Sequence, residues 1–154
     1  MIVERHDRQA QDMQRLPAIL SFLTLVIVLA GCGGGAPAVE YPIVPNESSI
    51  AAGASLYAVN CQTCHASPVS GGERLFGAPR HDVDGHTWHH VDRQLVEWVL
   101  DGVPAGSGVM PEFRGRLTEA EVASVLAYIK STWPGDVRAW QTEGSQAYED
   151  QLGR

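Results

Sequence analysis

The run Cys61-Gln62-Thr63-Cys64-His65 constrains this chain more than any other feature of its sequence. Two thiols separated by two residues can reach two neighbouring vinyl groups on a haem, because a short turn brings both cysteines to the same edge of the macrocycle. The histidine that follows can place its imidazole under the iron as the proximal ligand. The spacing therefore predicts one covalent haem c, bonded to Cys61 and Cys64, with His65 as an axial iron ligand.

Two other uses of a Cys-x-x-Cys pair are the alternatives. A redox-active dithiol of the thioredoxin kind is expected within a βαβ pattern, and the sequence shows no such alternation. Half of a zinc ribbon would need a second Cys-x-x-Cys pair, and the only further cysteine is Cys32.

Residues 1–31 resemble a signal peptide of the lipoprotein type. An arginine-containing start precedes the apolar stretch 16–30, which is shorter than the roughly 20 residues that span a bilayer as a helix. The stretch ends in Leu29-Ala30-Gly31-Cys32, which resembles a bacterial lipoprotein box and implies lipidation of Cys32. An uncleaved anchor with a buried Cys32 is the alternative, and both would tether the protein to the periplasmic face of a membrane in the cell envelope.

Glycine and proline are frequent in residues 32–47, directly after the predicted lipidation site. This composition is typical of a flexible linker. We therefore expect a lipid-anchored linker over 32–47, a globular domain over 48–132 and a C-terminal extension over 133–154.

The spacing of apolar residues predicts helices within this domain and no strands. Helices are expected over 48–60, 92–101 and 118–132, with a further short helix near 137–148. The fold class is therefore all-α, with three to five helices around the cofactor and long loops. Gly53 falls in the middle of the first helix, where glycine costs about 1 kcal/mol relative to alanine, so another backbone is expected to pass close to it.

Capping signals set the expected starts of these helices. Ser48 or Ser49 is expected to cap the first helix, and Asp92 the second. Thr118 and Glu121 match a capping box at the start of the third.

The formal net charge of −7 limits the partners of the protein. Nucleic acid is excluded as a partner because its phosphates require a basic patch, and the lysines and arginines here are scattered. An acidic redox protein would instead be steered to the basic docking face of another redox protein.

Met110 is the only methionine beyond the predicted leader, and it lies in the glycine- and proline-containing loop 106–111. Such a loop is poorly suited to core filling, the usual role of a lone methionine. A thioether is a soft axial ligand that raises the reduction potential of haem iron, so Met110 is predicted to be the second ligand. The competing ligands, which would give a bis-histidine iron, are His81, His86, His89 and His90.

Three histidines, His86, His89 and His90, lie close together around Trp88. Their imidazoles could bind copper or zinc. Alternatively, these histidines or the indole N–H of Trp88 could contact the haem propionates, or the segment could be a plain loop.

Over residues 48–132 the sequence resembles a class I c-type cytochrome of the small bacterial monohaem kind. The resemblance rests on the haem motif at residues 61–65 and on Met110-Pro111, which matches the distal ligand loop. It implies that Gly53 and Tyr57 pack against an aromatic residue of the helix expected over 118–132. It also implies that the carbonyl of Pro79 accepts the Nδ1 proton of His65 and orients the proximal ring.

This resemblance implies a monomeric electron carrier, not an enzyme, that acts between respiratory or dehydrogenase components. The alternatives are a peroxidase or gas sensor with an open iron site, and a copper-handling protein that uses the three histidines around Trp88.

Overall fold

The computed structural model describes residues 38–75, 77–103 and 110–153. The predicted leader, Cys32 and the loop preceding Met110 lie outside these ranges. Within the described ranges, no helix combines the length and the apolar character needed to cross a bilayer.

The described residues form helices joined by loops, and their only β-type pairings are isolated bridges. The all-α prediction is therefore confirmed. The longer helices are α3 (Glu47–Asn60), α5 (Asp92–Asp101), α6 (Glu119–Ser131) and α7 (Gly135–Leu152). Two short elements, α4 (Gln62–His65) and the 3-10 helix η1 (Thr87–His89), lie between α3 and α5 in the sequence.

Two of the expected helix caps are corrected by the structure. Asn46 caps α3, since its side chain accepts from the backbone N–H of Ser49, and the Ser49 side chain completes the capping box. At α5 the cap position is Val91, and Asp92 is instead a buried residue of the first turn. The capping box of Thr118 and Glu121 at α6 is confirmed.

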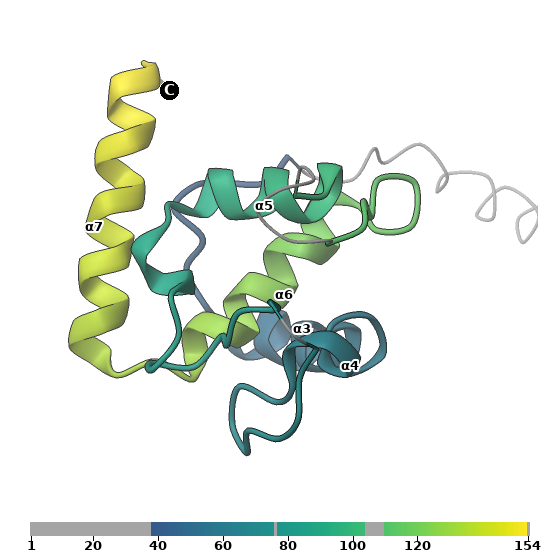
Figure 1. Ribbon diagram of the computed structural model, residues 1–154. Helices are drawn as coiled ribbons and strands as arrows, with labels where there is room; N and C mark the ends of the chain where they lie inside the picture. Colours follow the sequence, from purple (N-terminus) through teal and green to yellow (C-terminus); the bar gives the residue numbers. More distant parts are fainter. Residues whose placement is uncertain (1–37, 76, 104–109, 154) are drawn as a thin grey trace, which may run out of the picture. The chain divides into compact units, whose positions relative to one another are not determined.

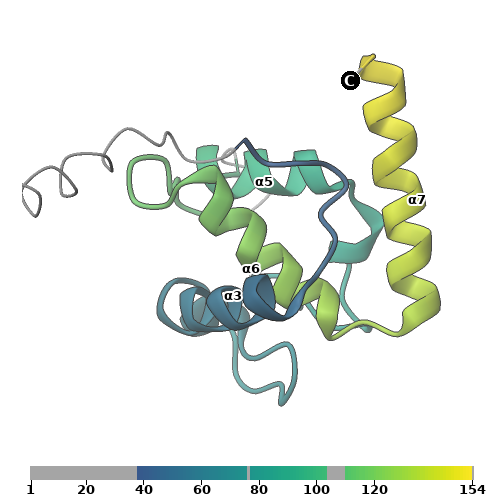
Figure 2. The ribbon, with the colours of Figure 1, turned by 180° about the vertical axis from the view of Figure 1, so that it is seen from behind.

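Helix α6 lies between α3 and α5 and carries much of the hydrophobic core (Figure 1; Figure 2). It crosses α3 at Gly53, where an added Cβ would stand 1.9 Å from the backbone oxygen of Ser124. One turn along, the rings of Tyr57 and Tyr128 meet edge to face at 5.5 Å. The expected packing of Gly53 and Tyr57 against an aromatic residue of this helix is thus confirmed.

Residues 38–46, which fall within the linker expected over 32–47, pack against the rest of the domain. The side chain of Ile43 is buried in the core, and its backbone N–H donates to a carboxylate oxygen of Asp92 at 2.7 Å. The hydroxyl of Tyr41 donates to Glu119 at 2.9 Å. Long-range contacts of this kind leave no local mark in a glycine- and proline-rich sequence, so composition alone suggested a linker.

Helix α7 is longer than the short helix expected near 137–148, and it lies beside η1 and α5 (Figure 1). Its buried residues are polar: Gln141, Ser145 and Glu149. The sequence signal of a packed helix is a periodic apolar stripe. The length of a helix that packs through polar side chains is therefore underestimated from sequence.

Candidate functional site

The two cysteines of the motif are held by one tight turn, which runs from the residue after α3 into the short helix α4. Cys61 directly follows α3, and its carbonyl accepts from the backbone N–H groups of Cys64 and His65 at 3.1 and 3.0 Å. The Cys61 side chain is buried, and that of Cys64 is half-buried. Burial raises the pKa of the Cys61 thiol to about 11. A redox-active dithiol works through a thiol of lowered pKa, so this environment disfavours that alternative.

His65 is buried, and its Nδ1 lies 2.9 Å from the carbonyl oxygen of Pro79. A carbonyl can only accept, so Nδ1 carries the proton and Nε2 keeps its lone pair. Burial lowers the pKa of His65, with the hydrogen bond to Pro79 acting in the opposite direction. The imidazole is therefore a neutral ring whose Nε2 can ligate a metal.

The ring of His81 stacks on the ring of His65, with centroids 4.3 Å apart and planes 28° apart. Burial, aided by the neighbouring His65, lowers the pKa of His81 to about 3, so this ring is also neutral. His81 is therefore engaged on both sides, by the ring of His65 and by the hydroxyl of Thr87, which lies 2.7 Å from its Nδ1.

Met110 begins a segment that folds back on the end of α5. Its carbonyl accepts from the backbone N–H of Val103 at 3.2 Å, and its side chain packs on the hydrophobic core. Gly102 makes this approach feasible, because it has a φ of +77° and an added Cβ would stand 2.9 Å from the Met110 oxygen. The residues just before Met110 lie outside the described residues.

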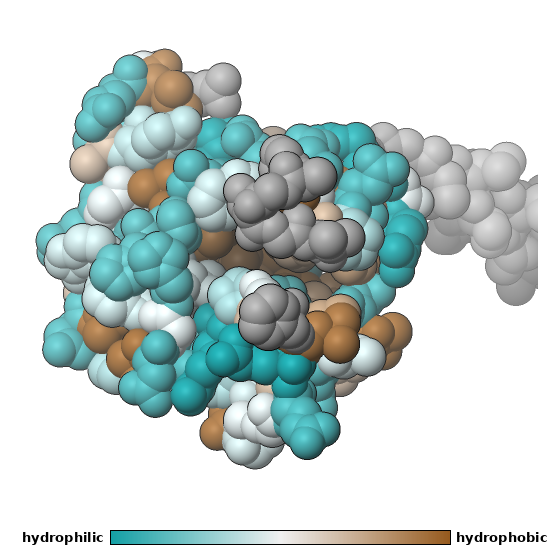
Figure 3. Space-filling view, viewed as in Figure 1, coloured by the Kyte–Doolittle hydropathy of each residue, from teal (hydrophilic) through white to brown (hydrophobic). Residues whose placement is uncertain are grey.

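The donor set of the described residues fits a covalently attached haem. Two thiols and an imidazole with a free lone pair come from one turn. The side chain of Met110 packs on the hydrophobic core, the role of a lone methionine that its loop was expected to disfavour. The space-filling view shows a hollow with a hydrophobic floor on the face that includes α5 and α4 (Figure 3). Apolar surface of this kind suits a macrocycle that is largely hydrophobic.

The histidines around Trp88 are arranged as an aromatic cluster. The ring of His86 stacks on His89 at 4.7 Å and meets His90 at 5.0 Å, and Trp88 stacks on His89 at 3.7 Å. Among the described residues, no group of three His, Cys, Asp or Glu side chains is arranged to hold a metal ion. The indole N–H of Trp88, one of the groups expected to contact a propionate, donates to the carbonyl of Val83 at 3.1 Å.

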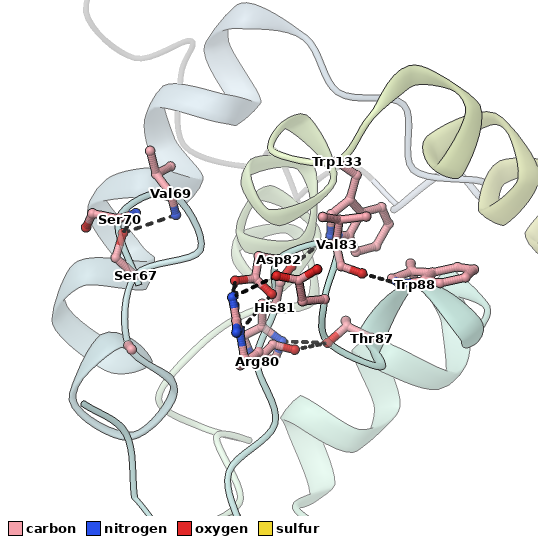
Figure 4. Close-up of polar contacts among 12 residues, drawn as sticks. Ser67, Val69, Ser70, Arg80, His81, Asp82, Val83, Thr87, Trp88 and Trp133 are labelled. Atoms are coloured by element: carbon pink, nitrogen blue, oxygen red, sulfur yellow. Dashed lines mark hydrogen bonds and ion pairs between the residues drawn. The ribbon is translucent and has the colours of Figure 1, made fainter. Parts of the chain in front are cut away.

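Sequence reasoning missed two residues that hold the loop around Pro79. Thr87 and Trp133 are buried, and each donates to a backbone carbonyl of that loop (Figure 4). Neither belongs to a motif, and no local signal in a single sequence points to such contacts.

Comparison with known proteins gives one family and several relatives. The family described as "Cytochrome C oxidase, cbb3-type, subunit III" matches residues 48–129. Cytochrome c6 of Leptolyngbya boryana is 37% identical over 79 residues, which cover 51% of this chain and 87% of that protein. No solved structure gives a significant match.

Two further relatives are much longer than the region they share with this chain. The cbb3-type cytochrome c oxidase subunit FixP of Sinorhizobium medicae (strain WSM419) is 28% identical over 111 residues, covering 68% of this chain and 37% of that protein. A nicotinate dehydrogenase subunit of Pseudomonas putida is 30% identical over 111 residues, covering 69% of this chain and 9% of that protein. Because the family match covers more than half of the chain, this protein belongs to the cbb3-type subunit III family of c-type cytochromes, whose members carry covalently bound haem c.

Proposed function

We propose that this protein is a membrane-tethered carrier of single electrons. The observation that carries the proposal is the hydrogen bond between His65 Nδ1 and the Pro79 carbonyl, because it leaves Nε2 free beside two thiols on the same turn. When bound, haem c takes up and gives up one electron at its iron. The family supports this role, since it is a family of electron-transfer cytochromes.

The residues of this chain have separate tasks in that role. Cys61 and Cys64 would attach the haem, while His65 and Met110 would be the two axial ligands. Pro79 fixes the tautomer and direction of the proximal ring. A ligand set retained in both oxidation states keeps structural change on electron transfer small. His81 covers one face of the proximal ring.

The proposed tether is a lipid on Cys32, which would place the domain on the periplasmic face of a membrane. It is supported by the apolar stretch 16–30 and by the lipoprotein-like residues Leu29 to Cys32. We propose that the domain acts there as a monomer.

The proposed partners are redox proteins with basic docking faces, among respiratory or dehydrogenase components. Two observations support this choice. The chain is acidic, with a formal net charge of −7. Its relatives include one component of a cbb3-type oxidase and one component of a nicotinate dehydrogenase.

Replacement of the proposed distal ligand tests the function. Holoprotein produced in a host that attaches haem should be six-coordinate and low-spin, with the absorption band of a methionine–iron bond. Met110→Ala should keep the haem attached and lower the reduction potential sharply, because the thioether stabilises ferrous iron. Glu112→Gln, an exposed change in the same segment, is the matched control and should leave the potential nearly unchanged.

Three results would contradict the proposal. An unchanged potential in Met110→Ala would remove Met110 as a ligand. A high-spin spectrum of the unmodified holoprotein would favour the peroxidase or gas-binding alternative. Colourless protein with both thiols free by mass spectrometry would remove haem attachment itself.

A further inference from the structure

The loop that contains Pro79 has an unusual hydrogen-bond pattern. We call residues 79–83 the proximal segment. All five of its backbone carbonyls accept a hydrogen bond, although the segment belongs to no helix or strand. The donors, in order along the segment, are His65 Nδ1, Thr87 Oγ1, Trp133 Nε1, the backbone N–H of Gly85 and Trp88 Nε1.

Trp133 links the proximal segment to the core of the domain. Its side chain is only 3% exposed, and its Nε1 donates to the carbonyl of His81 at 2.7 Å, two residues after Pro79 (Figure 4). Trp133 lies two residues after the last residue of α6, and its own backbone N–H donates to the carbonyl of Lys130 in the last turn of that helix. The end of α6 therefore determines where this part of the segment lies.

Thr87 holds the same segment from the side of η1. Its hydroxyl donates to the carbonyl of Arg80 at 3.2 Å, and its oxygen lies 2.7 Å from His81 Nδ1. A hydroxyl has one proton, so donation to Arg80 requires that His81 donates from Nδ1. This contact sets the tautomer of His81, whose ring stacks on His65.

The closure of this loop also depends on one glycine. An added Cβ at Gly85 would stand 2.1 Å from the backbone oxygen of Arg80. The backbone at Gly85 can therefore approach the carbonyl of Arg80 only because position 85 lacks a side chain. The bonds from Thr87 and Trp133 then hold a closed loop in one geometry.

We propose that Trp133 and Thr87 are positioning residues that tune the reduction potential by holding the Pro79 carbonyl against His65 Nδ1. The inference rests on the proposed function, since it concerns His65 as an iron ligand. A carbonyl held close to Nδ1–H makes the imidazole a more basic ligand and so stabilises the higher charge of ferric iron. Loss of a donor that holds the segment weakens this effect and raises the potential.

The test uses full-chain holoprotein and the substitution Trp133→Phe, which removes the indole donor and keeps an aromatic ring. We expect a shift to higher potential that corresponds to about twofold to tenfold in the equilibrium constant for reduction, where tenfold is roughly 59 mV for one electron. We also expect faster exchange of the His65 Nδ1 proton with solvent, measured by NMR. The matched control is Tyr148→Phe, which also removes one donor and keeps an aromatic ring, because Tyr148 is 37% exposed and lies towards the end of α7.

A second variant approaches the same segment from the other side. Thr87→Val is nearly isosteric, and it removes both the donor to Arg80 and the partner of His81 Nδ1. It should also raise the potential and speed the exchange of the His65 Nδ1 proton. If Trp133→Phe does not fold, the reduction potential and proton exchange of Thr87→Val alone test the proposal.

The proposal is overturned if a folded, haem-loaded variant keeps both the original reduction potential and the original exchange rate of the His65 Nδ1 proton. This holds even when the thermal stability of the variant has fallen. That result would make these residues packing and folding elements only. Failure of the proposed function looks different, since the unmodified protein would then give no haem c spectrum after alkaline pyridine treatment.

Discussion

The missing side chain of Gly53 determines how α3 and α6 cross. The backbone oxygen of Ser124 lies 1.9 Å from where a Cβ would stand, and the Cβ of Tyr128 lies 3.0 Å away. No side-chain rotation can relieve a contact with backbone. Glycine in a helix interior is intrinsically unfavourable, and the close approach of two helices offsets that cost.

Gly53→Ala is therefore expected to destabilise the domain by about 1–3 kcal/mol, because the helices must separate to admit a methyl group. The control is Gly144→Ala in α7, where the added Cβ meets nothing within 4 Å. This change should stabilise the protein by up to about 1 kcal/mol through helix propensity. Denaturant unfolding of both holoproteins measures the difference, and equal effects of the two substitutions would contradict the assigned crossing.

Among the helices, α5, α6 and α7 are joined by a buried polar network around Asp92. The Lys130 ammonium lies 2.7 Å from one oxygen of Asp92, and both side chains are fully buried. Gln141 from α7 donates to the other oxygen at 2.8 Å, and the Ser145 hydroxyl accepts from the backbone N–H of Asp92. Burial lowers the pKa of Lys130, while Asp92 acts against that shift. The network connects α7, which lies beyond the residues matched by the family, to the helices within the matched region.

Lys130→Met should destabilise the protein by about 3–5 kcal/mol, because it leaves the buried Asp92 carboxylate without a counter-charge. The double variant Asp92→Asn/Lys130→Met should recover part of this loss. A double-mutant cycle by thermal or denaturant unfolding measures the coupling. Arg114→Met, which removes the exposed pair with Asp101, is the control and should have little effect. Simple additivity of the Asp92 and Lys130 substitutions would contradict a coupled pair.

At the scale of the whole molecule, the dominant property is its negative charge. The formal net charge is −7, and any propionates exposed on a bound haem would add to it. Charges of one sign act on approaching molecules over roughly a Debye length, about 8–10 Å at physiological to moderate salt. The charge therefore affects the rate of encounter with redox partners more than the fold.

Two small oxidants of opposite charge test this expectation. The rate of oxidation of the reduced holoprotein by a cationic tris(phenanthroline)cobalt(III) complex should fall as ionic strength rises, because salt screens the attraction. With ferricyanide, an anion, the rate should rise instead. Stopped-flow absorbance at several salt concentrations gives both slopes. Slopes of the same sign would mean that the net charge does not govern approach to the haem.

The sequence predicted those features whose causes are local. Covalent geometry demands two thiols at close spacing with a ligand beside them, so the haem motif can be read from residues 61–65. A capping box closes within four residues, which is why the start of α6 was predicted correctly. Helix periodicity likewise predicted an all-α chain.

Contacts between distant residues were decided only by the tertiary structure. Asp92 was expected to be a helix cap, yet it is an ion-pair partner of Lys130, 38 residues away. Trp133 donates to His81 across 52 residues, and Ile43 to Asp92 across 49. A hydrogen bond across such a separation depends on how the helices pack, and neither residue type nor local spacing records that packing. The sequence by itself thus determined the attachment motif and the helical class, while packing alone determined which groups surround and hold His65.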